Sequence, residues 1–116
     1  MRVGIDSVEI DRIQKSFEIN GFFEKAYSPA EREFLRAKKN PYPSAAANFA
    51  AKEAFGKAMG CGLSGFSLDE VSVLRDDKGA PYLKLSGKAK ELGKLYRFTV
   101  SLTHTQTTAT AIVIAY

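Results

Sequence analysis

The sequence has 116 residues, of which 45% are hydrophobic and 26% are charged. This composition is typical of a folded globular protein and excludes a disordered or fibrous chain. No apolar run reaches membrane-spanning length, and a single cysteine, Cys61, excludes an internal disulfide bond. The N-terminus carries no charged-then-apolar leader, so we expect a cytoplasmic protein of one domain, residues 1–116. The net charge of +4 favours an acidic partner or a phosphorylated ligand.

The first predicted element is a strand over residues 2–8, because apolar residues alternate there. Gly4, Asp6 and Val8 share one face, which puts the Asp6 carboxylate among apolar neighbours near the end of the strand. A helix ending at Gly21 should follow, since apolar residues recur at helical spacing: Ile10, Ile13 and Phe17. Asp6 has two explanations at this point, as the N-cap of that helix or as a functional carboxylate.

A second helix is predicted by the capping-box pattern of residues 28–31, with proline at the first helical position. Residues 40–43 contain two prolines and predict a rigid turn. Ser44 is then the expected N-cap of a long central helix that ends at Met59. The glycine-rich residues 60–62 stop this helix.

The second half of the chain changes to strand-like periodicity. The expected elements are, in order, a strand at 71–74, a turn at 76–79, a strand at 82–85, a helix at 87–92 with Ser86 as its N-cap, and strands at 96–103 and 108–116. The fold class is therefore α+β. The last strand is apolar or small on both faces, which predicts a helix on one side and favours another subunit on the other.

The central helix has one unusual face, where Glu53, Gly56 and Gly60 align with Lys57 beside them. Each glycine costs roughly 1 kcal/mol relative to alanine, so this face predicts a need for space. Glu53 and Lys57 also have the spacing of an ordinary surface ion pair. If Asp6 and Glu53 met, their carboxylates would suit Mg²⁺, which commonly takes one or two carboxylates together with phosphate oxygens.

Three other features are candidates for chemistry: His104, the two glycines 60 and 62, and Cys61. His104 is the only histidine and lies among hydroxyls suited to phosphate, although a lone loop histidine is more often simply exposed. Gly60 and Gly62 could let backbone N–H groups approach a phosphate, but their spacing matches no P-loop or dinucleotide fingerprint. Cys61, between them, is better explained as a small turn residue than as a nucleophile.

Residues 4–13 and 49–60 together resemble the holo-acyl-carrier-protein synthase family of 4′-phosphopantetheinyl transferases. The segments 79–81, 85–87 and 101–105 are similar to family segments in the same order, so the resemblance covers nearly the whole chain. It implies an antiparallel sheet wrapped on a long central helix. It also implies homotrimers with active sites between subunits, which the two-faced last strand would suit.

The resemblance further implies transfer of phosphopantetheine from coenzyme A to a serine of acyl carrier protein, for fatty acid biosynthesis, with release of adenosine 3′,5′-bisphosphate. On the family pattern Asp6 and Glu53 bind Mg²⁺, and Lys57 stabilises or protonates the leaving oxygen. Arg12 corresponds to a position that meets the acidic carrier protein. The expected contacts to coenzyme A and its phosphates are Lys52, Lys57, Gly60, Gly62, His104 and Thr105. Neither a nucleic acid nor a membrane is an expected partner.

Two positions depart from the family pattern. Asn48 stands where many relatives carry arginine, and Cys61 stands where they carry threonine. Either affinity for coenzyme A is lower here or another basic residue substitutes. The alternative function is a small basic RNA-binding module, but the lysines and arginines are scattered and no RNP or GXXG motif is present.

Overall fold

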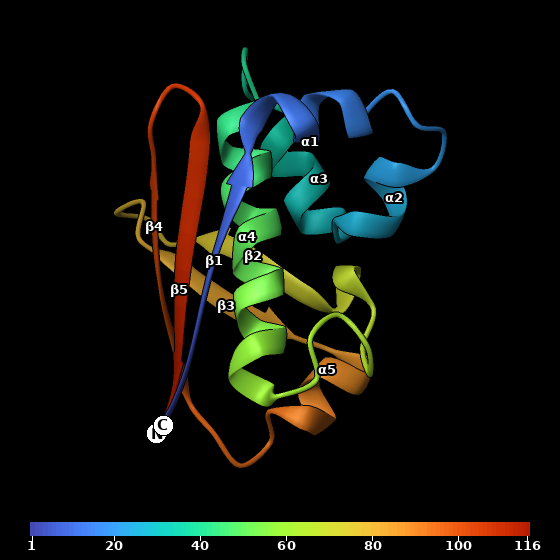
Figure 1. Ribbon diagram of the computed structural model, residues 1–116. Helices are drawn as coiled ribbons and strands as arrows, with labels where there is room; N and C mark the ends of the chain where they lie inside the picture. Colours follow the sequence, from blue (N-terminus) through green and yellow to red (C-terminus); the bar gives the residue numbers. More distant parts are fainter.

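The computed structural model describes residues 1–116 as two antiparallel sheets and four short α-helices around one long helix, α4 (Figure 1). The elements are β1 (Arg2–Glu9), α1 (Ile10–Ser16), α2 (Phe22–Ala26), α3 (Pro29–Arg36), α4 (Tyr42–Met59), the 3₁₀ helix η1 (Leu68–Glu70), β2 (Val71–Arg75), β3 (Pro81–Leu85), α5 (Gly87–Leu92), β4 (Phe98–His104) and β5 (Thr108–Ala115). The larger sheet has the order β1-β5-β4, and β2 and β3 form a separate hairpin. This arrangement confirms the α+β class and the sheet packed on a central helix. No helix combines the length and the apolar character needed to cross a membrane.

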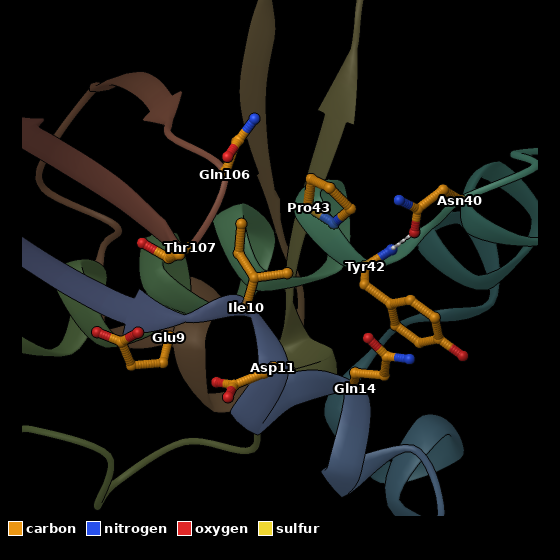
Figure 2. A pocket seen from close by; sticks show the side chains of 9 residues that line it. All are labelled: Glu9, Ile10, Asp11, Gln14, Asn40, Tyr42, Pro43, Gln106 and Thr107. Atoms are coloured by element: carbon orange, nitrogen blue, oxygen red, sulfur yellow. Dashed lines mark hydrogen bonds between the residues drawn. The ribbon is translucent and has the colours of Figure 1, made fainter.

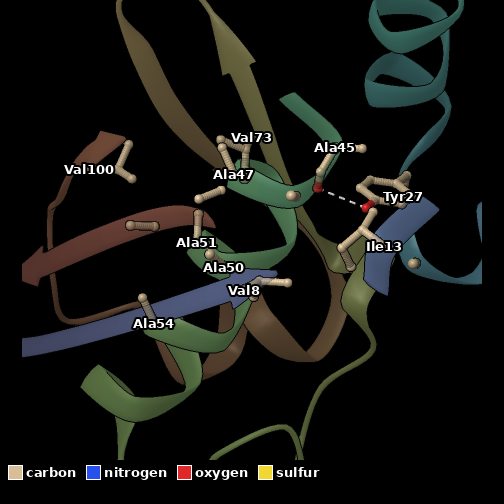
Figure 3. Close-up of a cluster of buried hydrophobic side chains, with 14 of the residues drawn as sticks. Val8, Ile13, Tyr27, Ala45, Ala47, Ala50, Ala51, Ala54, Val73 and Val100 are labelled. Carbon is tan, nitrogen blue, oxygen red and sulfur yellow. Dashed lines mark hydrogen bonds between the residues drawn. The ribbon is translucent and has the colours of Figure 1, made fainter. Parts of the chain in front are cut away.

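The core lies between α4 and the inner face of the larger sheet (Figure 3). The α4 residues in this core are mostly alanines, so the backbones of helix and sheet can approach closely. Gly4 of β1 marks the closest approach, since a Cβ atom there would lie 1.9 Å from the carbonyl oxygen of Ala54. The inner face of β5 carries only small side chains: Ala109, Ala111, Val113 and Ala115.

Local capping follows the prediction in α3, departs from it in α4 and α5, and decides between the two explanations of Asp6. Ser28 and Glu31 form the expected capping box of α3, with hydrogen bonds of 3.3 and 3.0 Å. Ser44 is not the N-cap of α4, because the helix begins at Tyr42 with Pro43 in its first turn, where a missing N–H is tolerated. Asp6 does not cap α1, since it lies inside β1.

The second departure is in α5, where Ser86 makes no side-chain cap bond. The Glu70 carboxylate accepts from the N–H of Lys88 at 3.0 Å instead. This contact comes from a distant part of the chain, so a local pattern could not reveal it. The short helix α2 was not predicted either.

A buried polar cluster joins α3, α4 and the hairpin. The ammonium of Lys52, with no exposed surface, donates to Glu31 Oε1 at 2.6 Å and to the carbonyls of Leu68 and Val71 at 2.9 and 2.5 Å. Asn48, also fully buried, donates to Glu31 Oε2 at 3.0 Å and to the carbonyl of Val73 at 3.1 Å. Burial lowers the pKa of Lys52, while the charge of Glu31 and its hydrogen bond oppose that shift. The cluster thus satisfies its own charges and ties the hairpin to α4.

We predict that Lys52→Ala destabilises the fold strongly, because it leaves the Glu31 carboxylate buried without its cation. The expected loss is about 3–5 kcal/mol in the free energy of unfolding, measured by urea denaturation. Lys94→Ala is the matched control, since it breaks the solvent-exposed pair with Glu91. That change should cost less than about 1 kcal/mol. Equal losses in the two variants would contradict a structural role for Lys52.

Candidate active site

The structure brings Asp6, Glu53 and Lys57 together on one flank of α4. Asp6 points from the inner face of β1 toward the helix, and the ammonium of Lys57 donates to Asp6 Oδ1 at 2.9 Å and to the carbonyl of Ile5 at 2.9 Å. Glu53 lies one helical turn before Lys57. The close approach at Gly4 holds the strand against the helix and so fixes this meeting.

The two carboxyl groups influence each other strongly. The pKa of Glu53 is raised to about 7, first by burial and then by the negative charge of the neighbouring Asp6 carboxylate. Lys57 and Arg12 oppose this shift. With both groups ionised, Oδ2 of Asp6 is buried without a donor. A proton on Glu53, or a cation, would therefore satisfy the pair.

The donor set fits a hard divalent cation. No group of three or more His, Cys, Asp or Glu side chains forms a closed metal cage. Mg²⁺ does not need one, because it commonly takes one or two carboxylates and completes its shell with water and phosphate oxygens. The unpartnered Oδ2 of Asp6 and the carboxyl of Glu53 are suitable oxygen ligands.

Lys57 keeps part of its ammonium available to a ligand. Its side chain is 53% exposed, whereas that of Asp6 is 14% exposed. Two of its three N–H donors are used by Asp6 and Ile5, which leaves one for an external anion. A phosphate oxygen beside the carboxyl pair would be within the reach of that donor.

The glycines of α4 have a different role from the one expected. The space beside Gly56 is filled by the chain itself, since a Cβ atom there would lie 1.8 Å from the carbonyl oxygen of Gly62. Gly60 ends the helix with a φ of 77°, in the left-handed region. The N–H groups of Gly60, Cys61 and Gly62 all bond to carbonyls of the last helical turn. Gly60 and Gly62 therefore offer no free N–H to a phosphate, which corrects that expectation.

Lys52 also requires a correction. It was expected to contact phosphate, but it is fully buried with all three donors used inside the protein. On α4 it points away from the flank that carries Glu53 and Lys57. Lys52 and Glu53 are neighbours in the sequence, but adjacent positions on a helix point in different directions.

His104 and Thr105 lie apart from the carboxyl pair. Asp6 pairs with Ala111 of β5, which pairs with Leu102 of β4, and His104 lies two residues further. With strands about 4.8 Å apart and about 3.4 Å per residue, the Cα atoms of Asp6 and His104 are about 12 Å apart. The Thr105 hydroxyl oxygen accepts from the N–H groups of Thr107 and Thr108, at 3.2 and 3.1 Å. The threonine thus shapes the β4–β5 turn.

Two more expected positions can be placed. Arg12 is exposed on α1, close enough to Glu53 for its charge to lower the pKa of that carboxyl. It therefore stands at the rim of the site, where a docking acidic protein could meet it. Cys61 is a free, partly exposed thiol in the turn after α4.

A polar groove of about 300 Å³ lies between α1, the turn before α4 and the β4–β5 turn (Figure 2). Glu9 and Asp11 are its charged lining residues. Because the groove carries no cationic side chain, it does not suit a phosphate.

Sequence reasoning missed one basic residue near a cavity. A second cavity of about 210 Å³ lies on the other flank of α4 and is lined by Arg75 and His104, among others. Nothing in the local pattern around Arg75 distinguishes it from the other basic residues of the chain. Its partnership with Asn48, 27 positions away, becomes visible only in the fold.

Comparison with known proteins identifies the family of this chain. Residues 2–113 match the 4′-phosphopantetheinyl transferase superfamily. The holo-[acyl-carrier-protein] synthase of Maridesulfovibrio salexigens is 44% identical, over 97% of this chain and 94% of that protein. That of Treponema denticola is 43% identical over the same shares.

Solved structures show the same fold. The holo-(acyl-carrier-protein) synthase of Bacillus anthracis, in complex with CoA (3′,5′-ADP), superposes with a TM-score of 0.85 at 31% identity and covers 98% of this chain and 94% of its own. The Helicobacter pylori synthase in complex with coenzyme A gives 0.84 at 30% identity, with coverage of 98% and 99%. The chain therefore belongs to the 4′-phosphopantetheinyl transferase superfamily.

Proposed function

We propose that this protein transfers the 4′-phosphopantetheine group of coenzyme A to a serine hydroxyl of an apo acyl carrier protein. The observation that carries the proposal is the meeting of Asp6, Glu53 and Lys57 on one flank of α4. The names of the relatives and the coenzyme A complexes of two solved neighbours support it. The RNA-binding alternative gains no support from the fold.

In this reaction the serine oxygen forms a bond to the phosphorus that carries pantetheine, and the pyrophosphate P–O bond breaks. Adenosine 3′,5′-bisphosphate leaves with the bonding electrons. Lys57 is placed to stabilise or protonate that leaving oxygen, because it has one donor free beside the carboxyl pair. Asp6 and the Ile5 carbonyl hold the ammonium in position.

Asp6 and Glu53 would hold Mg²⁺, which belongs to the same proposal. When bound there, the ion would withdraw negative charge from the pyrophosphate. The serine must also lose a proton, and Glu53 has a pKa of about 7 without metal, which suits a proton acceptor at neutral pH. Metal binding and proton acceptance compete for this one carboxylate, so the metal-bound protein needs another acceptor.

A homotrimer with active sites between subunits is the proposed assembly. The outer face of the sheet carries an apolar patch in which Ile5 lies opposite Ile112 and Val3 opposite Ile114. Val3 and Ile5 are 59% and 57% exposed, which is unusual for apolar strand residues in an isolated chain. The separation of His104 from the carboxyl pair gives a second reason, because two subunits could supply the two halves of one site.

A role in fatty acid biosynthesis and a cytoplasmic location complete the proposal. The carrier protein in the relatives' names supports the first. The free thiol of Cys61 agrees with a reducing compartment.

The direct test is intact mass spectrometry of an apo acyl carrier protein incubated with this protein, coenzyme A and Mg²⁺. We expect a mass gain of one phosphopantetheine group. Absence of the gain with several carrier proteins would refute the proposed function.

Lys57→Ala should lower kcat by about 10²–10³-fold with a smaller change in KM for coenzyme A, because the contact of its ammonium with the leaving oxygen strengthens in the transition state. Lys94→Ala is the control, because Lys94 is exposed and lies in the loop after α5.

The raised pKa of Glu53 predicts a pH-dependent stability of the metal-free protein. Because the folded state holds this proton more tightly than the unfolded state, stability is greatest below about pH 4.5 and is lost as pH rises to about 7. The melting temperature of Glu53→Gln relative to wild type should therefore increase between pH 5 and pH 8. Mg²⁺ at pH 8 should stabilise wild type more than Glu53→Gln. The exposed Glu33→Gln should show neither effect, and a flat difference for Glu53→Gln would contradict the assignment.

The apolar patch predicts the oligomeric state. Native mass spectrometry should show an assembly of three 12.7 kDa chains. Ile5→Asp should convert it to folded monomers, since it places a charge at the centre of the patch. Ile19→Asp is the matched control, because Ile19 is 63% exposed but lies outside the sheet. A wild-type monomer, or a trimer that survives Ile5→Asp, would contradict this interface.

A further inference from the structure

A basic groove lies beside α5, at the end of the molecule opposite α1 (Figure 1). Its volume is about 500 Å³, and it is formed by the end of β3, the end of α5, the loop after it and the start of β4. Four cations line this groove and no carboxylate does: Lys84, Lys90, Lys94 and Arg97. No residue of the candidate active site lines it, so the groove is a separate feature of the surface.

The positive charges of the groove are almost unopposed. Lys84, Lys90 and Arg97 take part in no salt bridge. Lys94 pairs with Glu91, but the two side chains are 60% and 72% exposed, so this pair contributes little. Cations that are gathered without acidic partners repel one another, and an anionic surface would relieve that repulsion.

A leucine protrudes from the loop beside these cations. Residues 93–96 form a turn that is closed by a hydrogen bond of 2.9 Å from the N–H of Tyr96 to the carbonyl of Gly93. Leu95 lies at the tip of this turn and is 84% exposed. Turn geometry favours Gly, Asn, Asp or Ser at such positions, so it does not explain a leucine.

The fold holds this turn in place from both ends. The N–H of Gly93 donates to the carbonyl of Ala89 at 3.0 Å, and the N–H of Arg97 donates to the carbonyl of Tyr116 at 2.7 Å. Leu95 is therefore kept in water by an ordered backbone, at a cost in hydrophobic free energy that a partner could recover.

The floor of the groove is apolar and its edge carries a tyrosine. Leu83, Leu85 and Phe98 are partly buried and pack against the core. The ring of Tyr96 lies 6.4 Å from that of Phe98, centre to centre. A side chain with an apolar ring and a hydroxyl suits the boundary between lipid and water.

We infer that this end of the protein binds the surface of an anionic phospholipid bilayer. The four cations of the groove lie against the headgroup phosphates, and Leu95 enters the boundary of the acyl chains. No helix has to cross the membrane for this contact. The inference goes beyond the proposed function, and Arg12 on α1, at the other end of the molecule, stays free for a carrier protein.

A bilayer fits these features better than the other anionic partners do. RNA offers bases that stack on aromatic rings, but it has no apolar layer for an aliphatic tip. An acidic protein would need a pocket shaped to receive Leu95, whereas a bilayer needs none. No membrane partner was expected from the sequence, because the cations come from β3, α5 and the loop after it and meet only in the fold.

Flotation of the full chain with lipid vesicles tests the inference. We expect wild type to bind vesicles in which about a third of the lipid is phosphatidylglycerol at least about tenfold more tightly than vesicles of phosphatidylcholine alone. Leu95→Ser should weaken binding to the anionic vesicles about tenfold, because the apolar contact is lost. Ile19→Ser is the matched control, since Ile19 is 63% exposed but lies outside the groove, and it should bind as wild type does.

The charge of the groove is tested by the double variant Lys90→Gln, Lys94→Gln. Each lysine near an anionic surface contributes about fivefold, so the pair should weaken binding about 25-fold. Lys25→Gln, Lys39→Gln removes the same net charge from exposed positions outside the groove and should have a much smaller effect. All of these side chains are exposed, and circular dichroism checks that each variant is folded.

Insertion of the tip is measured by fluorescence, because the chain contains no tryptophan. The emission of Leu95→Trp should shift to the blue on the anionic vesicles, and brominated acyl chains should quench it. Ile19→Trp should show neither change.

A wild type that does not float with the anionic vesicles would overturn the inference, and so would a Leu95→Ser variant that floats equally well. Binding to polyuridylate or to polyglutamate in place of the vesicles, lost in Lys90→Gln, Lys94→Gln, would also overturn it, because the groove would then serve RNA or an acidic protein. None of these measurements needs coenzyme A or a carrier protein. Their outcome is therefore independent of the proposed function.

Discussion

The contact between Gly4 of β1 and the backbone of Ala54 on α4 leaves no room for a side chain between strand and helix. This approach is possible because α4 presents alanines to the sheet and the inner face of β5 is equally small. Two residues along the strand, the same approach brings Asp6 against Glu53 and Lys57. A larger residue at Gly4 would push the strand away and separate the carboxyl pair, so the packing of the core and the geometry of the site are one constraint.

The other side of α4 serves stability first. Lys52, Asn48 and Glu31 satisfy each other's charges and hydrogen bonds where water is excluded. The same cluster reaches the surface through Arg75, whose guanidinium is oriented by Asn48. A buried network can therefore set the direction of a surface cation, because each of its members has only one arrangement that satisfies all donors and acceptors.

Much of the fold could be predicted from periodicity and capping patterns. The central helix, the hairpin and the two long strands follow from local apolar spacing, and Ser28 caps α3 as its sequence pattern indicates. The wrong predictions concern contacts between distant residues. Periodicity predicted free space beside Gly56, but Gly62 returns over it, which is a tertiary contact. The resemblance implied a phosphate contact for Lys52, but Glu31 and the hairpin carbonyls, which come from elsewhere in the chain, bind its buried ammonium. The sequence left open whether Asp6 meets Glu53 and Lys57, because that contact joins a strand to a helix about 50 residues away, and the structure brings the three together.

The arrangement of charge around α4 constrains how a coenzyme A molecule could be held. The carboxyl pair and Lys57 lie on one flank, while Arg75 and His104 lie on the other, with the helix between them. A single flexible ligand would have to pass around α4 to reach both within one chain. Two chains that meet through the apolar patch of Val3, Ile5, Ile112 and Ile114 could instead bring unlike flanks together. The trimer would then be part of the binding site, because α4 lies between the two flanks within each single chain.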